Sequence, residues 1–175
     1  MLVPLQSSLV PPTMELRSAF LEMADEFHLA GEDRYDSARD DFTAYLERVE
    51  QFSTGRDLSP DRVQSDEYWL ISEGRLIGRS GLRHRLTPAL ENEGGNIGYD
   101  IRPSKRRKGY GTLILKLTLE KARDLGLERV LVTCDEDNVG SAKIIENNGG
   151  VLGGKGASER SGKSVLQYWI NLSRD

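Results

Sequence analysis

The residues best suited to bind a ligand form a basic, glycine-rich turn at 106–111, which reads Arg-Arg-Lys-Gly-Tyr-Gly. Gly109 and Gly111 leave out the side chains that would keep a diphosphate away from the backbone. The three basic residues before them supply positive charge at the rim. The turn therefore predicts a site for a phosphorylated ligand, although the basic cluster by itself would also suit a nucleic-acid patch or a localisation signal.

The residues around this turn indicate that it joins a strand to a helix. The segment 97–101 alternates apolar residues in the manner of a strand, and Pro103 disfavours helix at Arg102 and ends the run. A helix that begins near Gly109 has first amides without partners inside the helix, with the positive end of the helix dipole behind them. We expect these amides to bind an anion.

This arrangement resembles the signature of the GNAT superfamily of acetyl-coenzyme A-dependent N-acetyltransferases. The family pattern is Gln/Arg-x-x-Gly-x-Gly/Ala directly after a strand that ends in x-Pro, and Arg106, Gly109 and Gly111 fill it. The resemblance implies direct transfer of an acetyl group from acetyl-coenzyme A to an amine, with both substrates bound together. The implied acceptor is a small-molecule or peptide amine, and no metal site is expected.

The downstream sequence extends the resemblance over about residues 96–152. Residues 129–134 read as a buried strand, and 137–149 are similar to the family's next helix. A helical crossover would make the strand 129–134 parallel to 97–101. The resemblance adds that these two central strands splay apart and that the cofactor arm enters between them.

The resemblance also assigns individual positions. A backbone N–H near Ile101 would stabilise the oxyanion, and polar residues at the start of the second helix would contact the cofactor arm. The alternative for Asn138 is a helix cap, and for Ser141 an exposed surface position. The residues assigned to cofactor binding are Ile101, Arg106, Arg107, Lys108, Gly109, Tyr110, Gly111, Thr112, Asn138 and Ser141.

The chain departs from the family where the general acid is concerned. Relatives often carry a tyrosine three to four residues before the closing glycine of the second helix, and the position here is Ile145. The closing Gly-Phe pair is replaced by Gly149-Gly150. Water or another group would then protonate the departing thiolate, and a second hypothesis is a catalytically silent acyl-coenzyme A sensor.

Four residues are candidates for the general base. Asp100 on the splayed strand is our first choice, and the others are His84, Glu67 and Asp135. For each of them the alternative is a solvated or paired surface group.

The acceptor is predicted from the acidic stretch between the first two expected helices. In this fold such a loop borders the acceptor site, so a cationic amine such as a polyamine, aminoglycoside or lysine-like group would suit it. The alternative is an ordinary solvated surface. The acidic residues are Glu32, Asp33, Asp36, Asp40 and Asp41.

Composition is that of an ordinary globular protein of one domain, spanning 1–175. The 175 residues are 37% hydrophobic and 30% charged, and the net charge of −4 disfavours a protein that coats nucleic acid. The single cysteine, Cys134, lies in an apolar segment and reads as a core residue in a reducing compartment. With neither a signal peptide nor a membrane-spanning segment recognisable, we expect a cytoplasmic protein. The sequence is compatible with either a monomer or a homodimer.

The remaining periodicities complete an α/β (α+β) fold. Apolar residues recur at helical spacing over 16–27 and again over 42–52, and 68–85 reads as a β-hairpin with a turn at Glu73-Gly74. Residues 87–95 read as a polar connection, and 165–170 as the last strand after a glycine-rich loop. The expected architecture is a GNAT-like mixed, mainly antiparallel sheet flanked by helices, with two splayed parallel central strands.

One further motif competes with this assignment. Residues 157–164, Ala-Ser-Glu-Arg-Ser-Gly-Lys-Ser, formally satisfy the phosphate-loop pattern of an ATPase when alanine is allowed at its start. A phosphate loop must open a helix, whereas the β-rich segment 165–170 follows here. Context therefore disfavours this hypothesis.

Overall fold

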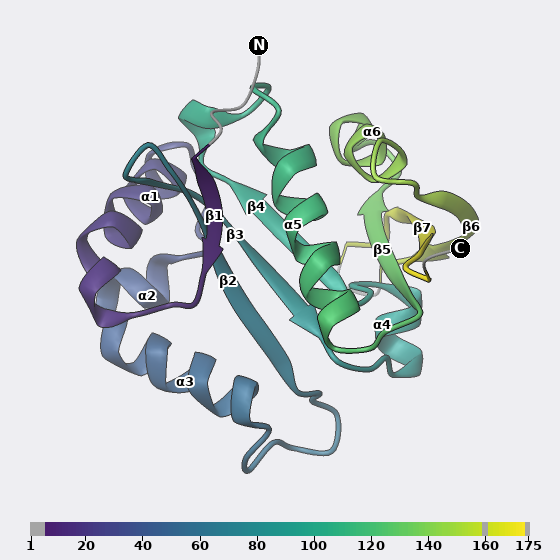
Figure 1. The fold of residues 1–175 in the computed structure, drawn as a ribbon, viewed down its shortest axis with the longest axis horizontal. Helices are drawn as coiled ribbons and strands as arrows, with labels where there is room; N and C mark the ends of the chain where they lie inside the picture. Colours follow the sequence, from purple (N-terminus) through teal and green to yellow (C-terminus); the bar gives the residue numbers. More distant parts are fainter. Residues whose placement is uncertain (1–5, 159–160, 174–175) are drawn as a thin grey trace.

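The computed structural model describes residues 6–158 and 161–173. Within these ranges one sheet of seven strands has the order β1-β2-β3-β4-β5-β7-β6 (Figure 1). The strands are β1 (Ser7–Val10), β2 (Ser65–Ser72), β3 (Arg75–Arg83), β4 (Ile97–Ile101), β5 (Arg129–Asp135), β6 (Val151–Ala157) and β7 (Ser164–Asn171). The helices are α1 (Arg17–Leu29), α2 (Asp36–Asp40), α3 (Phe42–Thr54), α4 (Pro88–Asn92), α5 (Tyr110–Asp124) and α6 (Val139–Glu146), with 3-10 turns η1 (Met14–Leu16) and η2 (Pro103–Lys105).

The predicted fold class is confirmed. Neighbouring strands of the sheet are antiparallel except for β4 and β5, which are parallel and joined by the helix α5. This parallel pair aligns only at Ile97 and Val132, whereas β5 and β7 pair along seven residues. The strands β4 and β5 therefore separate beyond Ile97, which is the predicted splay (Figure 1).

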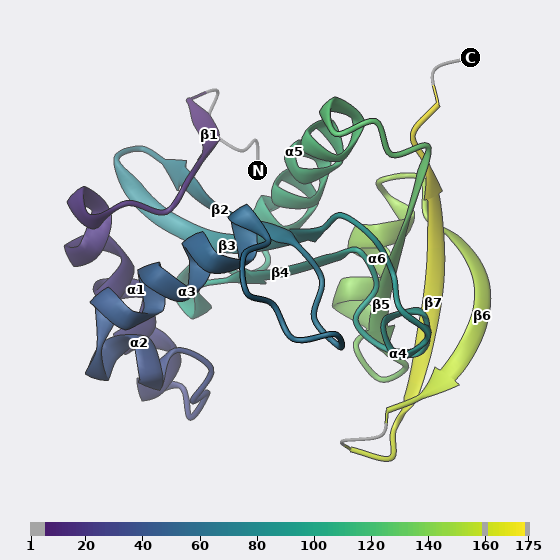
Figure 2. The same cartoon turned by 90° about the horizontal axis from the view of Figure 1, so that it is seen from below.

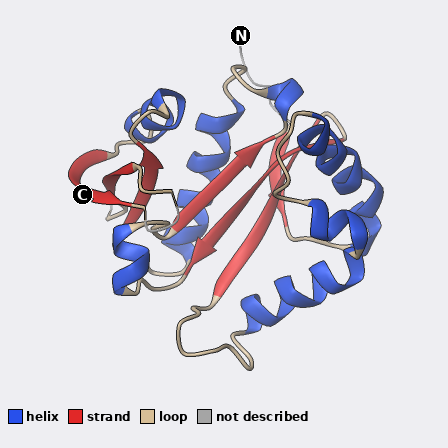
Figure 3. Cartoon of the chain, turned by 180° about the vertical axis from the view of Figure 1, so that it is seen from behind, coloured by secondary structure: helices blue, strands red, loops and turns tan. Residues whose placement is uncertain are grey.

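Helices cover both faces of the sheet (Figure 2), and Figure 3 shows the same sheet from behind. Adjacent residues of β2 reach opposite layers, because side chains alternate along a strand. Trp69 packs with Phe20 and Phe42 under α1 and α3, while Leu70 packs with Ile114 of α5. A further cluster joins α5 and α6 to β4, β5 and β7. Among the described helices, none combines the length and apolar character needed to cross a lipid bilayer.

Several elements differ from the sequence-based expectation. The polar connection 87–95 contains α4, which Thr87 caps by accepting a hydrogen bond of 3.3 Å from the N–H of Leu90. The glycine-rich segment 151–157 is strand β6, because the adjacent β7 offers backbone partners along it, with one shift of register between Leu152 and Gly154. The short strand β1 and the single-turn helix α2 were also not expected, since four or five residues carry little periodic signal.

The stretch 157–164 joins the antiparallel strands β6 and β7. Residues 159–160 of this stretch lie outside the described part of the chain. As expected, a strand rather than a helix follows it, so the context that an ATPase phosphate loop requires is absent from the described chain.

Candidate active site

The glycine-rich turn leads directly into helix α5, as predicted. Gly109 precedes the first helical residue with a φ of +86°, a left-handed conformation that side chains disfavour. The N–H of Leu113 donates to the carbonyl of Gly109 at 3.1 Å. The N–H groups of residues 110–112 therefore have no partner within the helix and face the turn. Free amides at the positive end of a 15-residue helix fit the diphosphate of coenzyme A.

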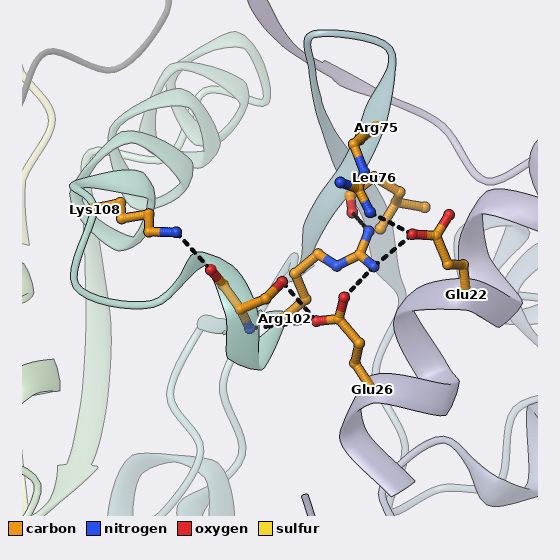
Figure 4. Close-up of polar contacts among 7 residues, drawn as sticks. Glu22, Glu26, Arg75, Leu76, Arg102 and Lys108 are labelled. Carbon is orange, nitrogen blue, oxygen red and sulfur yellow. Dashed lines mark hydrogen bonds and ion pairs between the residues drawn. The ribbon is translucent and has the colours of Figure 1, made fainter. Parts of the chain in front are cut away.

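Two of the three basic side chains of the turn bind the protein itself. The Nη2 of Arg106 lies 2.7 Å from Glu32, and its Nε donates to the carbonyl of Ile101 at 3.0 Å. The ammonium of Lys108 donates to the carbonyl of Ser104 at 2.8 Å (Figure 4). In this arrangement both side chains shape the turn.

The remaining predicted residues of the turn differ in exposure. Arg107 is exposed, adopts a φ of +58° and has no side-chain partner within the described chain. Tyr110 is only 5% exposed, with its hydroxyl 3.5 Å from that of Ser72, so its backbone N–H is the group that faces the turn. The carbonyl of Thr112 accepts a hydrogen bond of 3.2 Å from Asn148, which ties α5 to the end of α6.

A buried arginine just before the turn anchors it to α1, a role that the sequence by itself did not indicate. Arg102 has no exposed surface. Its Nη1 donates to the carbonyl of Leu76 at 3.0 Å, and its Nη2 contacts Glu22 at 2.9 Å and also Glu26 (Figure 4). Ser104 donates to Glu26 at 2.8 Å. The one available signal was the pair of glutamates four residues apart on a predicted helix.

The open edge of β4 faces β5. The N–H of Arg102 donates to Ile77 of β3 at 2.9 Å, so the alternating N–H groups of Tyr99 and Ile101 point to the opposite edge. The strand β5 aligns with β4 only at Ile97. The N–H of Ile101 thus faces the gap between the splayed strands, where an oxyanion donor was predicted.

Two hydroxyl groups meet across this gap. Tyr99 of β4 and Ser141 of α6 share a hydrogen bond of 2.8 Å, and burial raises the pKa of Tyr99 to about 12. The side chain of Asn138 accepts a hydrogen bond of 3.0 Å from the N–H of Ser141, so Asn138 caps α6. Cys134 is 8% exposed, and burial raises the pKa of its thiol. Ile145 is fully buried.

A cavity of about 460 Å³ lies over β2, β3 and β4, on the face of the sheet that α2 and α3 cover. Residues of α2, α3, α4, β2, β3 and β4 line it, together with the loops before α2 and β2. Its floor contains Gly81 and Gly98, which are directly opposite each other on β3 and β4. A β-carbon placed on Gly98 would meet no heavy atom within 4 Å. The paired glycines therefore keep the floor free of side chains.

Asp100, the first candidate base, lines this cavity. Its carboxylate receives a hydrogen bond of 2.9 Å from the hydroxyl of Tyr35 and pairs with Arg34. Burial is the main cause that raises the pKa of Tyr35 well above its ordinary value, and the negative charge of Asp100 is the second cause. Tyr35 therefore remains a hydrogen-bond donor and fixes the orientation of the carboxylate.

The second candidate base, Glu67, lies in the same cavity. Its carboxylate accepts from the indole of Trp69 at 3.0 Å and from the hydroxyl of Tyr45. Arg79 lies between the two candidates, 2.7 Å from Glu67 and 4.0 Å from Asp100. Tertiary structure thus brings Asp100 and Glu67 together around one guanidinium.

The other two candidate bases lie elsewhere. His84 bonds to Asp66 at 2.8 Å beyond the end of β3, and Asp135 is the last residue of β5, across the splay. Neither lines the cavity.

Much of the acidic stretch between α1 and α3 serves local structure. Glu32 pairs with Arg106, and Asp36 lies 3.0 Å from the ring of His28. Asp41 caps α3 by accepting a hydrogen bond of 2.9 Å. These carboxylates are therefore engaged by neighbouring groups of the protein.

Comparison with known proteins agrees with this geometry. A family model described as an acetyltransferase (GNAT) domain matches residues 7–151. Similar solved structures include RimL, a ribosomal L7/L12 alpha-N-protein acetyltransferase in complex with coenzyme A, with 14% identity, a TM-score of 0.74, and 99% of this chain and 98% of that one covered. Another is yncA, a putative acetyltransferase from Salmonella typhimurium with acetyl-coenzyme A, with 13% identity, a TM-score of 0.64, and 97% and 95% covered.

A third similar structure is the microcin C7 self-immunity acetyltransferase MccE in complex with acetyl-coenzyme A and AMP. It is 13% identical, with a TM-score of 0.71 and 96% and 93% of the two chains covered. No curated protein sequence matches the chain significantly.

The fold places the glycine-rich turn at the start of α5, beside the open strand edge of β4. The chain belongs to the GNAT acetyltransferase family, which confirms the resemblance drawn from the glycine-rich turn. It is an N-acetyltransferase that uses acetyl-coenzyme A.

Proposed function

We propose that this enzyme transfers an acetyl group directly to a primary amine that enters through the cavity beside Asp100. The arrangement of β4 is the observation that carries this proposal. The N–H groups of Tyr99 and Ile101 face the gap between the splayed strands, whereas Gly98 and Asp100 face the cavity. An amine in the cavity and an acyl group in the gap would therefore meet at a single strand.

Each residue near this meeting point has a group suited to one task. Asp100 would accept the proton of the amine, directly or through a water molecule. The N–H of Ile101 would stabilise the negative charge that develops on the carbonyl oxygen. Bound acetyl-coenzyme A would supply the activated acetyl group. The free amides of residues 110–112 would hold its diphosphate, and exposed Arg107 would add positive charge.

The hydroxyl pair of Tyr99 and Ser141 is our candidate for protonating the leaving thiolate. It replaces the tyrosine that relatives often carry at the position of the buried Ile145. Because the pKa of Tyr99 is about 12, its hydroxyl keeps its proton throughout the neutral range. Ser141, at 2.8 Å, can relay that proton.

The test is thiol release from acetyl-coenzyme A across a panel of primary amines, with wild type and Tyr99→Phe compared. We expect kcat of the variant to fall about 100-fold, the low end for loss of a general acid, with little change in the KM of the acceptor. Wild-type kcat should show no loss from Tyr99 ionisation below about pH 11, since its pKa is about 12.

Tyr168→Phe is a matched control. Its hydroxyl donates to Glu146 of α6 at 3.2 Å, so the variant also removes one tyrosine hydroxyl that contacts this helix. Its kcat should stay within about twofold of wild type. Equal kcat values for the Tyr99 and Tyr168 variants would remove Tyr99 from the mechanism. Binding of acetyl-coenzyme A without turnover of any amine would refute the proposed transfer.

A further inference from the structure

The charges that line the cavity identify a chemical class of acceptor. Every carboxylate on its wall already has a partner within the protein. Asp100 pairs with Arg34, and Glu67 pairs with Arg79. The other two follow the same rule, since Asp66 contacts His84 at 2.8 Å and Asp61 accepts from Ser59 at 2.6 Å. Little unpaired negative charge is left to attract a polycation.

Two arginines on the same wall lack such neutralisation. In the part of the chain that the structure describes, neither Arg48 nor Arg83 has a carboxylate partner. The Nη1 of Arg83 donates to two neutral carbonyls, those of Gly94 and Gly95, each at 3.0 Å. The guanidinium of Arg48 lies over the ring of Tyr45, 5.8 Å from its centroid. Both arginines line the cavity.

The environment of Arg83 also shows an excess of positive charge. Burial lowers the pKa of Arg83, and the nearby cations Arg79 and Arg62 lower it further. An anion bound beside Arg83 would relieve this repulsion, because opposite charges at a partly buried site attract strongly. A cationic group in the same place would increase it.

The sheet register sets the length of the acceptor. Arg79 is opposite Asp100, and Arg83 lies four residues further along β3 on the same face. At about 3.3 Å per residue, the two levels are about 13 Å apart. The glycine pair of Gly81 and Gly98 lies between them, so an extended molecule can rest on the floor. Two residues of extended peptide followed by a glutamate side chain span roughly this distance.

We propose that the acceptor is an amine that also carries a carboxylate about 10–13 Å away, with the amine beside Asp100 and the carboxylate at Arg83 and Arg48. This assignment rests on the proposed function, because it takes the cavity as the acceptor site. It is the opposite of the cationic acceptor that the acidic stretch predicted. An unblocked peptide with an acidic third residue is the simplest molecule that meets the requirement.

Three tripeptide amides test the proposal: Ala-Ala-Glu, Ala-Ala-Gln and Ala-Ala-Lys. They share an N-terminal amine and differ in the charge of one side chain. Thiol release with acetyl-coenzyme A gives kcat/KM, and calorimetry without acetyl-coenzyme A gives the affinity of each peptide for the protein. We expect the glutamate peptide to exceed its isosteric glutamine analogue about tenfold in both measurements, with the lysine peptide weakest.

Arg48→Gln should reduce the preference for glutamate over glutamine to about a third or less of its wild-type value, because it removes one of the two unneutralised cations. Arg48 is exposed on α3, so the fold should tolerate the change. Arg17→Gln on α1 is the control, since it makes the same charge change outside the cavity. The control should keep the full preference.

The outcomes separate the two proposals. Turnover of all three peptides with equal efficiency, or fastest turnover of the lysine peptide, overturns the carboxylate assignment and leaves amine acetylation intact. Absence of turnover with every amine overturns the proposed function. In that case calorimetry still decides the assignment, because a glutamate preference that Arg48→Gln weakens supports it and charge-independent binding overturns it.

Discussion

Arg102→Met tests whether the buried guanidinium holds α1 against the glycine-rich turn. The substitution keeps an unbranched apolar stem but removes the bonds to Leu76, Glu22 and Glu26 (Figure 4). Burial by itself would raise the pKa of Glu26, yet hydrogen bonds from Arg102 and Ser104 outweigh it and lower this pKa from 4.5 to about 2.

The size of the effect follows from that shift. The fall of the Glu26 pKa from 4.5 to about 2 corresponds to about 3 kcal/mol of unfolding free energy at neutral pH. Part of it comes from Ser104, which the variant retains, and the exposed side of Glu22 can be rehydrated. Loss of the partner of the Leu76 carbonyl adds about 1 kcal/mol. We therefore expect Arg102→Met to lower the free energy of unfolding by about 2–3 kcal/mol at pH 7.

The stability difference between wild type and Arg102→Met should depend on pH. Glu26 has a lower pKa in the folded protein than in the unfolded chain, so its contribution is present above pH 4.5 and is lost as the pH falls towards 2. The difference between wild type and Arg102→Met should therefore be largest at pH 7 and should shrink steadily below pH 4.5. Urea denaturation at pH 7, 4 and 3 measures it.

Arg75→Met provides the comparison. Arg75 also contacts Glu22, but its side chain is 51% exposed, so its loss should cost less than about 1 kcal/mol. Equal destabilisation by the two variants, or a loss for Arg102→Met that is the same at pH 7 and pH 3, would refute this reasoning.

Two substitutions of glycine probe the two halves of the site. Gly98→Val should raise the acceptor KM about tenfold by filling the cavity floor. A β-carbon there meets no neighbour within 4 Å, so the affinity for acetyl-coenzyme A and the melting temperature should stay near wild type, and an unchanged KM would place the acceptor elsewhere. Gly109→Ala forces a side chain onto a φ of +86° and should cost about 1–2 kcal/mol of stability while weakening acetyl-coenzyme A binding. Gly140→Ala in α6, where the added carbon finds its nearest neighbour at 3.6 Å, should neither destabilise the protein nor weaken acetyl-coenzyme A binding, and it serves as the control in calorimetry and thermal melts.

Local sequence was sufficient for the strand, the glycine-rich turn and the helix that we propose for cofactor binding. Each of the local signals acts through the backbone of a few neighbouring residues. These signals are the alternation over 97–101, the stop at Pro103 and the glycines at 109 and 111. The structure accordingly has β4, the turn and α5 in that order. The strand β6 was missed because its glycines have low strand propensity, and pairing with β7 overrides that preference.

Side-chain partnerships were beyond the reach of the sequence. The basic run 106–108 predicted three phosphate-binding side chains, yet Arg106 and Lys108 bind the protein, and which residues they meet depends on how α1 packs. The same holds for Asp100, whose partners Arg34 and Tyr35 lie more than 60 residues away in the chain. Such distant contacts leave no periodic or compositional trace.

By itself the sequence determined a GNAT acetyltransferase with a glycine-rich turn between β4 and α5, because backbone conformation and helix amides depend on nearby residue types. Only the tertiary structure decided that Arg102 is an internal anchor, that the hydroxyls of Tyr99 and Ser141 meet across the splay, and that the cavity wall has unneutralised arginines. The physical reason is that the effect of a charge or hydroxyl depends on what surrounds it, and packing supplies those surroundings from distant parts of the chain.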